Sequence, residues 1–166
     1  LKDPVKVSVT PVAKTADRVA QEVIFIEQQK KRALLVELFA NQDMTRTIVF
    51  TRTKRGADRV ARHLESNGVP VSAIHGNKSQ AQRDQAMKGF KAGKIRALIA
   101  TDIAARGIDV DAVSHVINYE IPNVPESYVH RIGRTGRAGR TGVAITFAEP
   151  REHRLLRNIE RLTKQK

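Results

Sequence analysis

Short apolar runs alternate with longer amphipathic stretches from about residue 20 to the end of the chain. The apolar runs have the length of buried strands, and the stretches between them repeat their apolar residues at helical spacing. We predict strands at residues 22–28, 46–53, 69–76, 95–101, 112–120 and 141–149, and helices at residues 30–41, 54–68, 79–93, 125–133 and 151–166. Strands separated by helices favour a mainly parallel sheet covered by helices on both faces, which is a three-layer α/β fold.

Several of the predicted helices carry start and end signals. Gly68 is placed to end the second helix, because glycine readily adopts the left-handed conformation found there. Ser79 and Gln82 have the spacing of a capping box at the start of the third helix, and Pro125 suits the first turn of the fourth. These signals support the helix assignments independently of the apolar pattern.

The length of 166 residues fits one domain. Residues 1–20 have weak periodicity, so we expect a linker or leading arm there and the domain at residues 21–166. No apolar run approaches the roughly 18 residues of a membrane span, and the opening LKDPVKV lacks the form of a signal peptide. We therefore expect no membrane partner. The chain has no cysteine, so we also expect a cytoplasmic protein without disulfides or thiolate metal sites.

The formal net charge is +13, from 30 Lys and Arg against 17 Asp and Glu. Such an excess attracts polyanions and speeds encounter with them, although a basic protein that merely stays soluble is the alternative. Aromatic residues make up only 4% of the chain and tryptophan is absent, which argues against a surface built on base stacking. The composition therefore favours sequence-tolerant contacts to a nucleic-acid backbone.

The segment GFKAGKI at residues 89–95 superficially resembles a phosphate-binding loop. It has three residues between its glycines where that loop has four, and Ile95 follows the lysine where Ser or Thr should bind magnesium. We interpret it as a helix that ends at Gly93. No other phosphate loop occurs in the chain and we predict no metal site, so a bound nucleotide would need another segment for its phosphates and metal.

The segment YVHRIGRTGRAGRTG at residues 128–142 is the strongest candidate for chemistry. Its arginines recur every third residue and are interleaved with glycines, so one helical face cannot accommodate them all. Guanidinium groups bind phosphate oxygens in a bidentate manner and stay charged at every relevant pH. A disordered Arg/Gly tail is the alternative, but strand-like sequence on both sides favours an ordered loop that projects the guanidinium groups.

Together, these motifs resemble those of DEAD-box RNA helicases. HRIGRTGR is similar to motif VI of that family, ATDIAARGIDV to motif V, VFTRTKRGAD to motif IV, and IHG, QAQR and VINYEIP to the motifs between and after them. They occur in family order over residues 46–148, and the stretch from IHG to AARG is most similar to the bacterial RhlE type. The resemblance implies a RecA-like fold and the C-terminal motor domain alone, because the motifs of the first domain are absent. Asn77 and Glu120 stand where the family usually has Asp.

The resemblance also implies roles for the motif VI residues. Arg134 and Arg137 match the two arginine fingers that reach the γ-phosphate of ATP and act as catalytic residues in phosphoryl transfer. His130 and Arg131 match the pair that couples to the first domain. A structural histidine and a surface arginine are the alternatives for that pair.

Motif V supplies the expected nucleotide contacts. Asp109 matches the aspartate that accepts from the ribose hydroxyls, and Gly107 lets the backbone approach the nucleotide closely. Without the family, an aspartate in this loop could cap a helix, as we expect of Asp102.

Four further residues fall where the family contacts RNA phosphates: Thr101, Gly76, Arg83 and Arg55. For Arg83 the alternative is a solvated position, because it lies on an amphipathic helix. For Arg55 the sequence does not decide between an RNA contact and a solvated position.

The implied protein is an RNA-stimulated ATPase that unwinds or remodels RNA locally. Its cofactor is ATP with Mg²⁺, held mainly by an N-terminal RecA-like domain, and its partners are RNA, that domain and candidate ribosomal or RNA-decay assemblies. We expect the isolated chain to hydrolyse no ATP. The alternatives are a non-catalytic RNA-binding module and the motor domain of a DNA helicase or translocase of the same superfamily.

Overall fold

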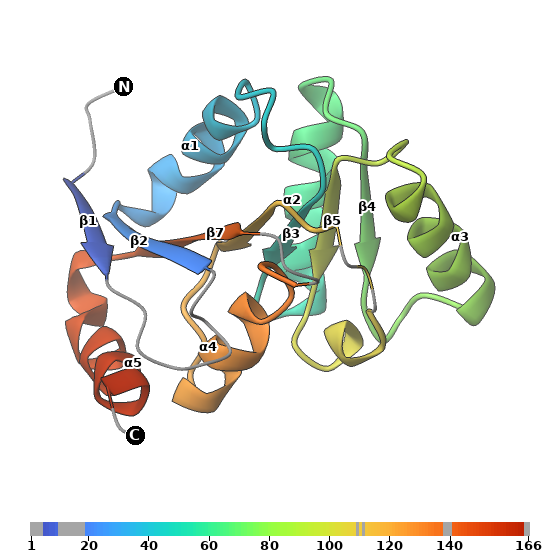
Figure 1. Ribbon diagram of the computed structural model, residues 1–166. Coiled ribbons are helices and arrows are strands. Elements are labelled where there is room, and N and C mark those ends of the chain that lie inside the picture. The colour runs from blue at the N-terminus through green and yellow to red at the C-terminus, as the bar shows by residue number, and fades with distance from the viewer. Residues whose placement is uncertain (1–4, 10–18, 109, 111, 138–140, 165–166) are drawn as a thin grey trace.

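A seven-stranded sheet forms the centre of the molecule in the computed structural model, which describes residues 5–9, 19–108, 110, 112–137 and 141–164 (Figure 1). The strand order is β1-β2-β7-β6-β3-β5-β4. All neighbours from β2 to β4 pair in parallel, and β1 pairs antiparallel with β2 at the edge. The strands are β1 Val5–Val9, β2 Val19–Phe25, β3 Thr47–Phe50, β4 Val71–Ile74, β5 Ala97–Ala100, β6 His115–Asn118 and β7 Gly142–Ala148.

Helices connect the parallel strands, as the alternating sequence pattern predicts. The α-helices are α1 Lys31–Leu38, α2 Lys54–Ser66, α3 Gln80–Lys91, α4 Pro125–Ile132 and α5 His153–Lys164. Short 3₁₀ turns precede or replace some of them: η2 Gln28–Lys30, η3 Ala104–Gly107 and η4 Pro150–Glu152. Among the described residues, no helix has the length and apolar character needed to cross a lipid bilayer.

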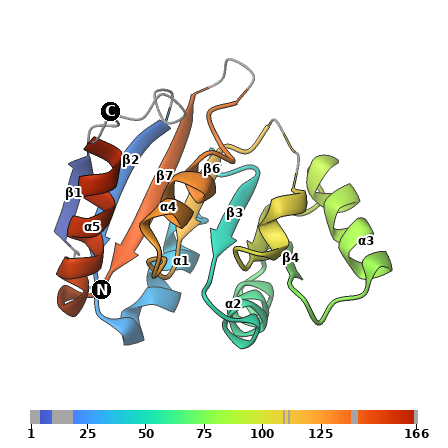
Figure 2. The same ribbon diagram turned by 90° about the horizontal axis from the view of Figure 1, so that it is seen from below.

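The two faces of the sheet bury separate apolar clusters. On one face, Leu35 of α1 and Leu64 of α2 pack with Val49 and its neighbours from the central strands. The other face is covered by α3 and η3 over β3 and β5, and by α4 and α5 over β2 and β7 (Figure 2). Consecutive strand residues such as Ile48 and Val49 fall in different clusters because side chains alternate across a strand. The predicted three-layer α/β architecture is confirmed.

Residues 5–9 extend the sheet, although we expected a linker or arm over residues 1–20. Val5, Val7 and Val9 alternate with polar residues, which is the period of a half-buried strand. The register places Val7 opposite Val23 of β2. The signal is five residues long, so only pairing with β2 distinguishes it from an extended arm.

The predicted start of α3 and the predicted ends of α2 and α3 are confirmed. Ser79 accepts the N–H of Gln82 at 3.1 Å, and Gln82 accepts the N–H of Ser79 at 2.9 Å, which completes the capping box. Gly68 and Gly93 have φ of 81° and 80° after α2 and α3, a conformation that favours glycine.

Two arginines, Arg96 and Arg46, hold the last carbonyls of α1 and α3. Arg96 Nη2 donates to the carbonyls of Phe39 and Asn41 at 2.9 and 3.1 Å, and Arg46 donates to those of Phe90 and Lys91 at 3.1 and 3.0 Å. Helix C-terminal carbonyls lack partners within the helix and carry partial negative charge, so guanidinium groups stabilise them. These arginines therefore have structural roles at the end of the sheet opposite the candidate site.

The arginine and glycine segment after α4 folds back against the start of β7. Thr135 is buried, and its hydroxyl donates to the carbonyl of Val113. Gly136 has a φ of 68°, and a Cβ on Gly142 would collide with the Thr135 side chain and lie 2.6 Å from Gly136 N. The glycines at positions 136 and 142 thus permit a close approach that holds the described part of this segment in one conformation.

We predict that Gly142→Ala lowers the free energy of unfolding by about 1–3 kcal/mol, because the added methyl has no space beside Thr135. Urea unfolding followed by circular dichroism measures the change. Gly107→Ala is the matched control, since a Cβ there meets nothing within 4 Å. Equal stability of the two variants would contradict the packing of this loop.

Candidate functional site

The candidate residues gather where the parallel strands end. Thr101 follows β5, Glu120 follows β6 and Thr51 follows β3, so one edge of the sheet carries all three connections. Ligands of α/β sheets commonly bind outside these carboxyl ends. A pocket beside α4 and an open groove beside α2 meet at this edge, and Asp102 lines both.

The pocket is organised around a buried arginine, Arg131 of α4, which is 1% exposed. Its Nε and Nη2 donate to the two carboxylate oxygens of Asp102 at 2.7 and 2.9 Å. Its Nη1 donates to the carbonyl of Glu120 at 2.6 Å and to Asn118 Oδ1 at 3.2 Å. The guanidinium carbon also lies 5.1 Å from the centre of the Phe50 ring. One side chain therefore joins α4 to the ends of β5, β6 and β3.

This geometry corrects two expectations. Asp102 does not cap the following helix: the residue before η3 is Ile103, without a side-chain cap, and Asp102 binds Arg131 instead. The alternative of a surface position for Arg131 is also wrong, because the side chain is enclosed. The predicted coupling of Arg131 to another domain stays a prediction, and direct contact would require Arg131 to leave these partners.

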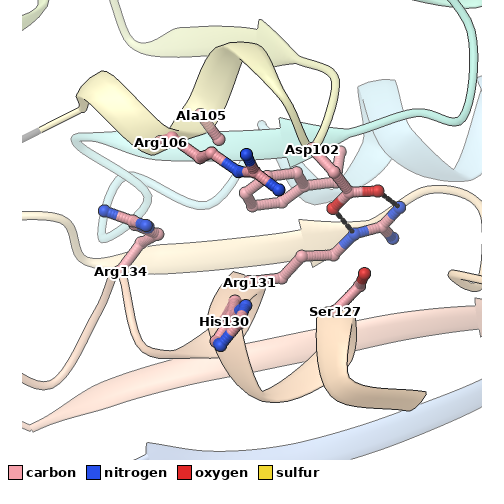
Figure 3. A pocket seen from close by; sticks show the side chains of 8 residues that line it. Asp102, Ala105, Arg106, Ser127, His130, Arg131 and Arg134 are labelled. Atoms are coloured by element: carbon pink, nitrogen blue, oxygen red, sulfur yellow. Dashed lines mark hydrogen bonds and ion pairs between the residues drawn. The ribbon is translucent and has the colours of Figure 1, made fainter. Parts of the chain in front are cut away.

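The other motif VI side chains are more accessible. His130 is exposed on the last turn of α4, and Arg134 is half-buried just after it. Arg134 Nη1 donates to the carbonyl of Ile108 at 2.9 Å, which joins the turn after α4 to the connection after η3. Figure 3 shows Arg134 and Arg106 at one end of the pocket, with the Asp102–Arg131 pair at the other.

Arg137 is half-buried in the same segment as Arg134, and both arginines interact with the rest of the chain. Asp109, the predicted ribose ligand, lies outside the described residues, as does Arg140, the last arginine of the segment at residues 128–142. The structure thus brings Arg131, Arg134 and His130 to one pocket.

The open groove collects the predicted phosphate contacts of α2 and β5. Thr101 and Arg55 both line it, together with Lys54 and Asn77. Lys54 Nζ donates to Asn77 Oδ1 at 3.3 Å, so α2 reaches across to the turn after β4. Several positive charges on one side of a groove suit a chain of phosphates. Thr101 and Arg55 thus line one groove, and their contact with RNA phosphates stays a prediction.

The turn after β4 is held by a buried histidine, His75, which is 1% exposed. Its Nδ1 accepts the N–H of Asn77 at 3.2 Å, so its Nε2 donates to Asp58 Oδ1 at 2.9 Å. Partial burial raises the pKa of Asp58, but the hydrogen bond from His75 and the Lys78 ammonium 3.4 Å away outweigh it, and the net pKa is lowered. The turn that carries Gly76 is thereby fixed to α2.

Gly76 lies beside Lys54, since a Cβ there would come within 3.2 Å of Lys54 Cε. Arg83 and Gly107 line a separate hollow between α3 and η3, next to the groove. The structure therefore places Thr101 and Arg55 in the groove, Arg83 in the hollow, and Gly76 beside Lys54 of the groove.

Our sequence reasoning missed Lys54, Arg59 and the partner role of Asp102. Lys54 and Arg59 flank Arg55 in the segment TKRGADR, so the basic start of α2 was a usable signal. No sequence signal pairs Asp102 with Arg131, because 29 residues separate them along the chain.

Comparison with known proteins identifies the family. Residues 29–139 match the model of the helicase conserved C-terminal domain. The E. coli DEAD-box protein SrmB, solved bound to regulator of ribonuclease activity A, is 40% identical, with a TM-score of 0.77 over 83% of this chain and 81% of that chain. The chain belongs to the DEAD-box family of helicase C-terminal domains.

Other DEAD-box proteins support this assignment and its fold. The DEAD-box ATP-dependent RNA helicase CshA of Bacillus subtilis is 46% identical over all 166 residues, and this chain spans 34% of its length. Dbp5 of S. cerevisiae, solved bound to RNA and ADP BeF3, is 33% identical with a TM-score of 0.78, covering 93% of this chain and 43% of that one. The chain thus spans about a third of the curated relative and corresponds to a domain of it.

The two departures from the usual DEAD-box motifs have defined contacts. Glu120, in place of Asp, accepts the N–H of Arg52 at 2.8 Å through Oε1. Arg52 in turn donates to the carbonyl of Ile121 at 2.7 Å and to Glu152 at 3.2 Å. Asn77, in place of Asp, accepts from Lys54. Both residues therefore brace the carboxyl edge of this DEAD-box domain.

We predict that Arg131→Lys lowers the free energy of unfolding by about 2 kcal/mol, because one ammonium cannot replace the fork that binds Asp102 and the Glu120 carbonyl together. Chemical denaturation measures this difference. Arg106→Lys serves as control, since Arg106 lines the same pocket but is exposed. A loss of stability no larger than that of the control would refute the structural role of Arg131.

Proposed function

We propose that this chain is the second motor domain of an ATP-dependent RNA helicase that unwinds or remodels RNA locally. The proposal rests mainly on one observation: Asp102 is a shared wall of the arginine pocket and the basic groove, in a chain without a phosphate-binding loop. A site of this kind is half of a nucleotide site placed next to a track for a polyanion. The names of DEAD-box relatives, which include ATP-dependent RNA helicases, agree with it.

The arginine pocket fits the outer phosphates of ATP better than it fits the metal. Within the described ranges, no group of three or more His, Cys, Asp or Glu side chains could hold a metal ion. We therefore assign Mg²⁺ mainly to an N-terminal domain of the longer protein. Bound ATP supplies the phosphoryl group, and Arg134 and Arg137 neutralise the negative charge that develops on it during transfer to water.

The pocket positions Arg134 through the backbone around it. Its Nη1 contact to the Ile108 carbonyl ties motif VI to motif V, one residue before Asp109. We propose that Asp109 accepts from the ribose hydroxyls and that Gly107 leaves space for the nucleotide. Ribose and phosphate contacts would then move together when the two motor domains close.

In the proposed function, RNA binds along the groove and in the adjacent hollow between α3 and η3. Thr101, Arg55 and the turn at Gly76 contact its phosphates, and Arg83 adds a contact across η3. Such contacts are to the backbone, so they position RNA without reading its sequence. His130 and the Asp102–Arg131 pair between groove and pocket couple RNA binding to the nucleotide side and to the N-terminal domain.

Three finer proposals concern the subfamily, the location and the partners of the longer protein. The segment from IHG to AARG supports the RhlE type among DEAD-box proteins. The absence of cysteine supports a cytoplasmic location. The resemblance to RNA helicases supports ribosomal or RNA-decay assemblies as partners of the longer protein.

We predict that the isolated chain shows no ATP turnover with saturating RNA, because its sequence has no phosphate-binding loop and its described residues form no cluster that could hold the metal. In the longer protein, Arg137→Ala lowers kcat on the order of 10³-fold, as for arginine fingers of other NTPases. A coupled steady-state ATPase assay measures both. Arg154→Ala on α5 is the control, because Arg154 is exposed and does not line the pocket. Turnover by the isolated chain that Arg137→Ala abolishes would refute the proposed division of roles.

We also predict that the chain binds single-stranded RNA with an affinity that falls steeply as salt rises, because phosphate contacts release counterions. Each lost phosphate contact lowers the slope of log K against log salt by about 0.7. Fluorescence anisotropy between about 50 and 200 mM salt measures the slope. Lys54→Gln, which removes a groove charge, reduces it, and a salt-independent affinity would contradict backbone binding.

A further inference from the structure

A second basic hollow lies on the other side of the start of α2, and neither motif V nor motif VI contributes to it. It is lined by residues from η2, from the start of α1, from α2 and from the connection after β6: Gln28, Gln29, Arg32, Gly56, Arg59, Val60, Tyr119 and Glu120. Both helices lie on the same face of the sheet. The hollow therefore belongs to the carboxyl edge, but to the face opposite α4.

Two guanidinium groups from different helices reach this hollow. Arg32 comes from α1 and Arg59 from α2, and both are exposed. Within the described part of the chain, no hydrogen bond or ion pair occupies either one. Both charges act to lower the pKa of the same phenol, that of Tyr119, so they converge on one place.

Tyr119 supplies a hydroxyl at that place. Tyr119 is 5% exposed. The centre of its ring lies 5.8 Å from Lys31 Nζ and 5.8 Å from the centre of the Phe147 ring, and these contacts fix the ring. Its hydroxyl has no hydrogen-bond partner among the described residues and is not one of their enclosed unpaired polar atoms, so it is open to solvent at the hollow that Tyr119 lines. Burial outweighs the nearby charges and raises the pKa of Tyr119 to about 12, so the hydroxyl is a donor at neutral pH.

The one carboxylate that lines the hollow is already engaged. Glu120 Oε1 accepts the N–H of Arg52, so its charge is partly compensated at the end of β3. Two guanidinium groups therefore face one carboxylate, and the hollow keeps a positive balance. A fixed donor between two forked cations suits a tetrahedral anion with several acceptor oxygens, which is the chemistry of a phosphate group.

We propose that this hollow binds a phosphate of the RNA strand that continues past the groove over the start of α2. The groove and the hollow are continuous at Arg59, because this residue lines both. The basic residues Lys54 and Arg55 on the groove side and Arg32 on the hollow side make one track around the first turns of the helix. This inference rests on the proposed function as an RNA-binding domain.

The test compares RNA affinities of single variants of the 166-residue chain. We expect Arg32→Gln to weaken binding of a single-stranded RNA of about 15 nucleotides by about two- to fivefold and to lower the salt slope by about 0.7. Tyr119→Phe keeps the buried ring, and we expect it to weaken binding in the same range. Arg62→Gln is the matched control, since Arg62 is exposed on α2 and lines neither depression, and it leaves affinity unchanged.

Lys54→Gln distinguishes the two proposals. If Lys54→Gln weakens RNA binding while Arg32→Gln and Tyr119→Phe both match the control, the groove is correct and the second hollow is not part of the track. If the chain binds no RNA at low salt, both proposals fail.

Inorganic phosphate distinguishes the two sources of the anion. Titration followed by NMR should shift the amide signals of Gly56 and Glu120, and bound RNA should suppress those shifts. Phosphate-induced shifts that persist unchanged with RNA bound would assign the hollow to a free phosphorylated ligand and would overturn the RNA track.

Discussion

The enclosed guanidinium of Arg131 sets the arrangement of the whole functional edge. A charge inside a protein is tolerated only when ion-pairing and hydrogen-bonding groups surround it. Its partners come from separate connections, Asp102 after β5, Asn118 of β6 and the Glu120 carbonyl, so α4 can dock in only one position. Because Arg134 lies one turn beyond Arg131 on the same segment, its location follows from that docking.

The parallel sheet explains why charges of one sign accumulate at this edge. Every strand from β2 to β7 ends there, so connections distant in the sequence become neighbours without long loops. The start of α2 stands in the middle, with the groove on one side and the second hollow on the other, and Arg59 lines both. His75, which binds Asp58 and holds the turn after β4, is buried, whereas Lys54 and Arg55 are exposed. The fold thus separates residues that hold the edge from residues that present charge.

Much of the architecture follows from local patterns. Ala57, Val60 and Leu64 repeat at helical spacing and are all buried in α2, and the Ser79 capping box forms as its residues predict. Strand β1 was missed because five alternating residues carry little information until β2 pairs with them. The main signal for the site is also local, because the spacing of arginines and glycines after α4 indicates phosphate binding. In the structure, the contacts of Thr135 and Gly142 hold the described part of this segment in one conformation.

The sequence by itself determined the main helices and strands after residue 20, the three-layer class and the identity of the motifs, because periodicity, capping and turn chemistry act over a few residues. Only the tertiary structure decided which polar residues are partners. Asp102 caps a helix or binds Arg131 depending on what lies opposite the end of β5, and Tyr119 is a core ring or a donor depending on where its hydroxyl emerges. Such choices depend on distances between connections far apart in the chain, and those distances exist only after the strands have paired.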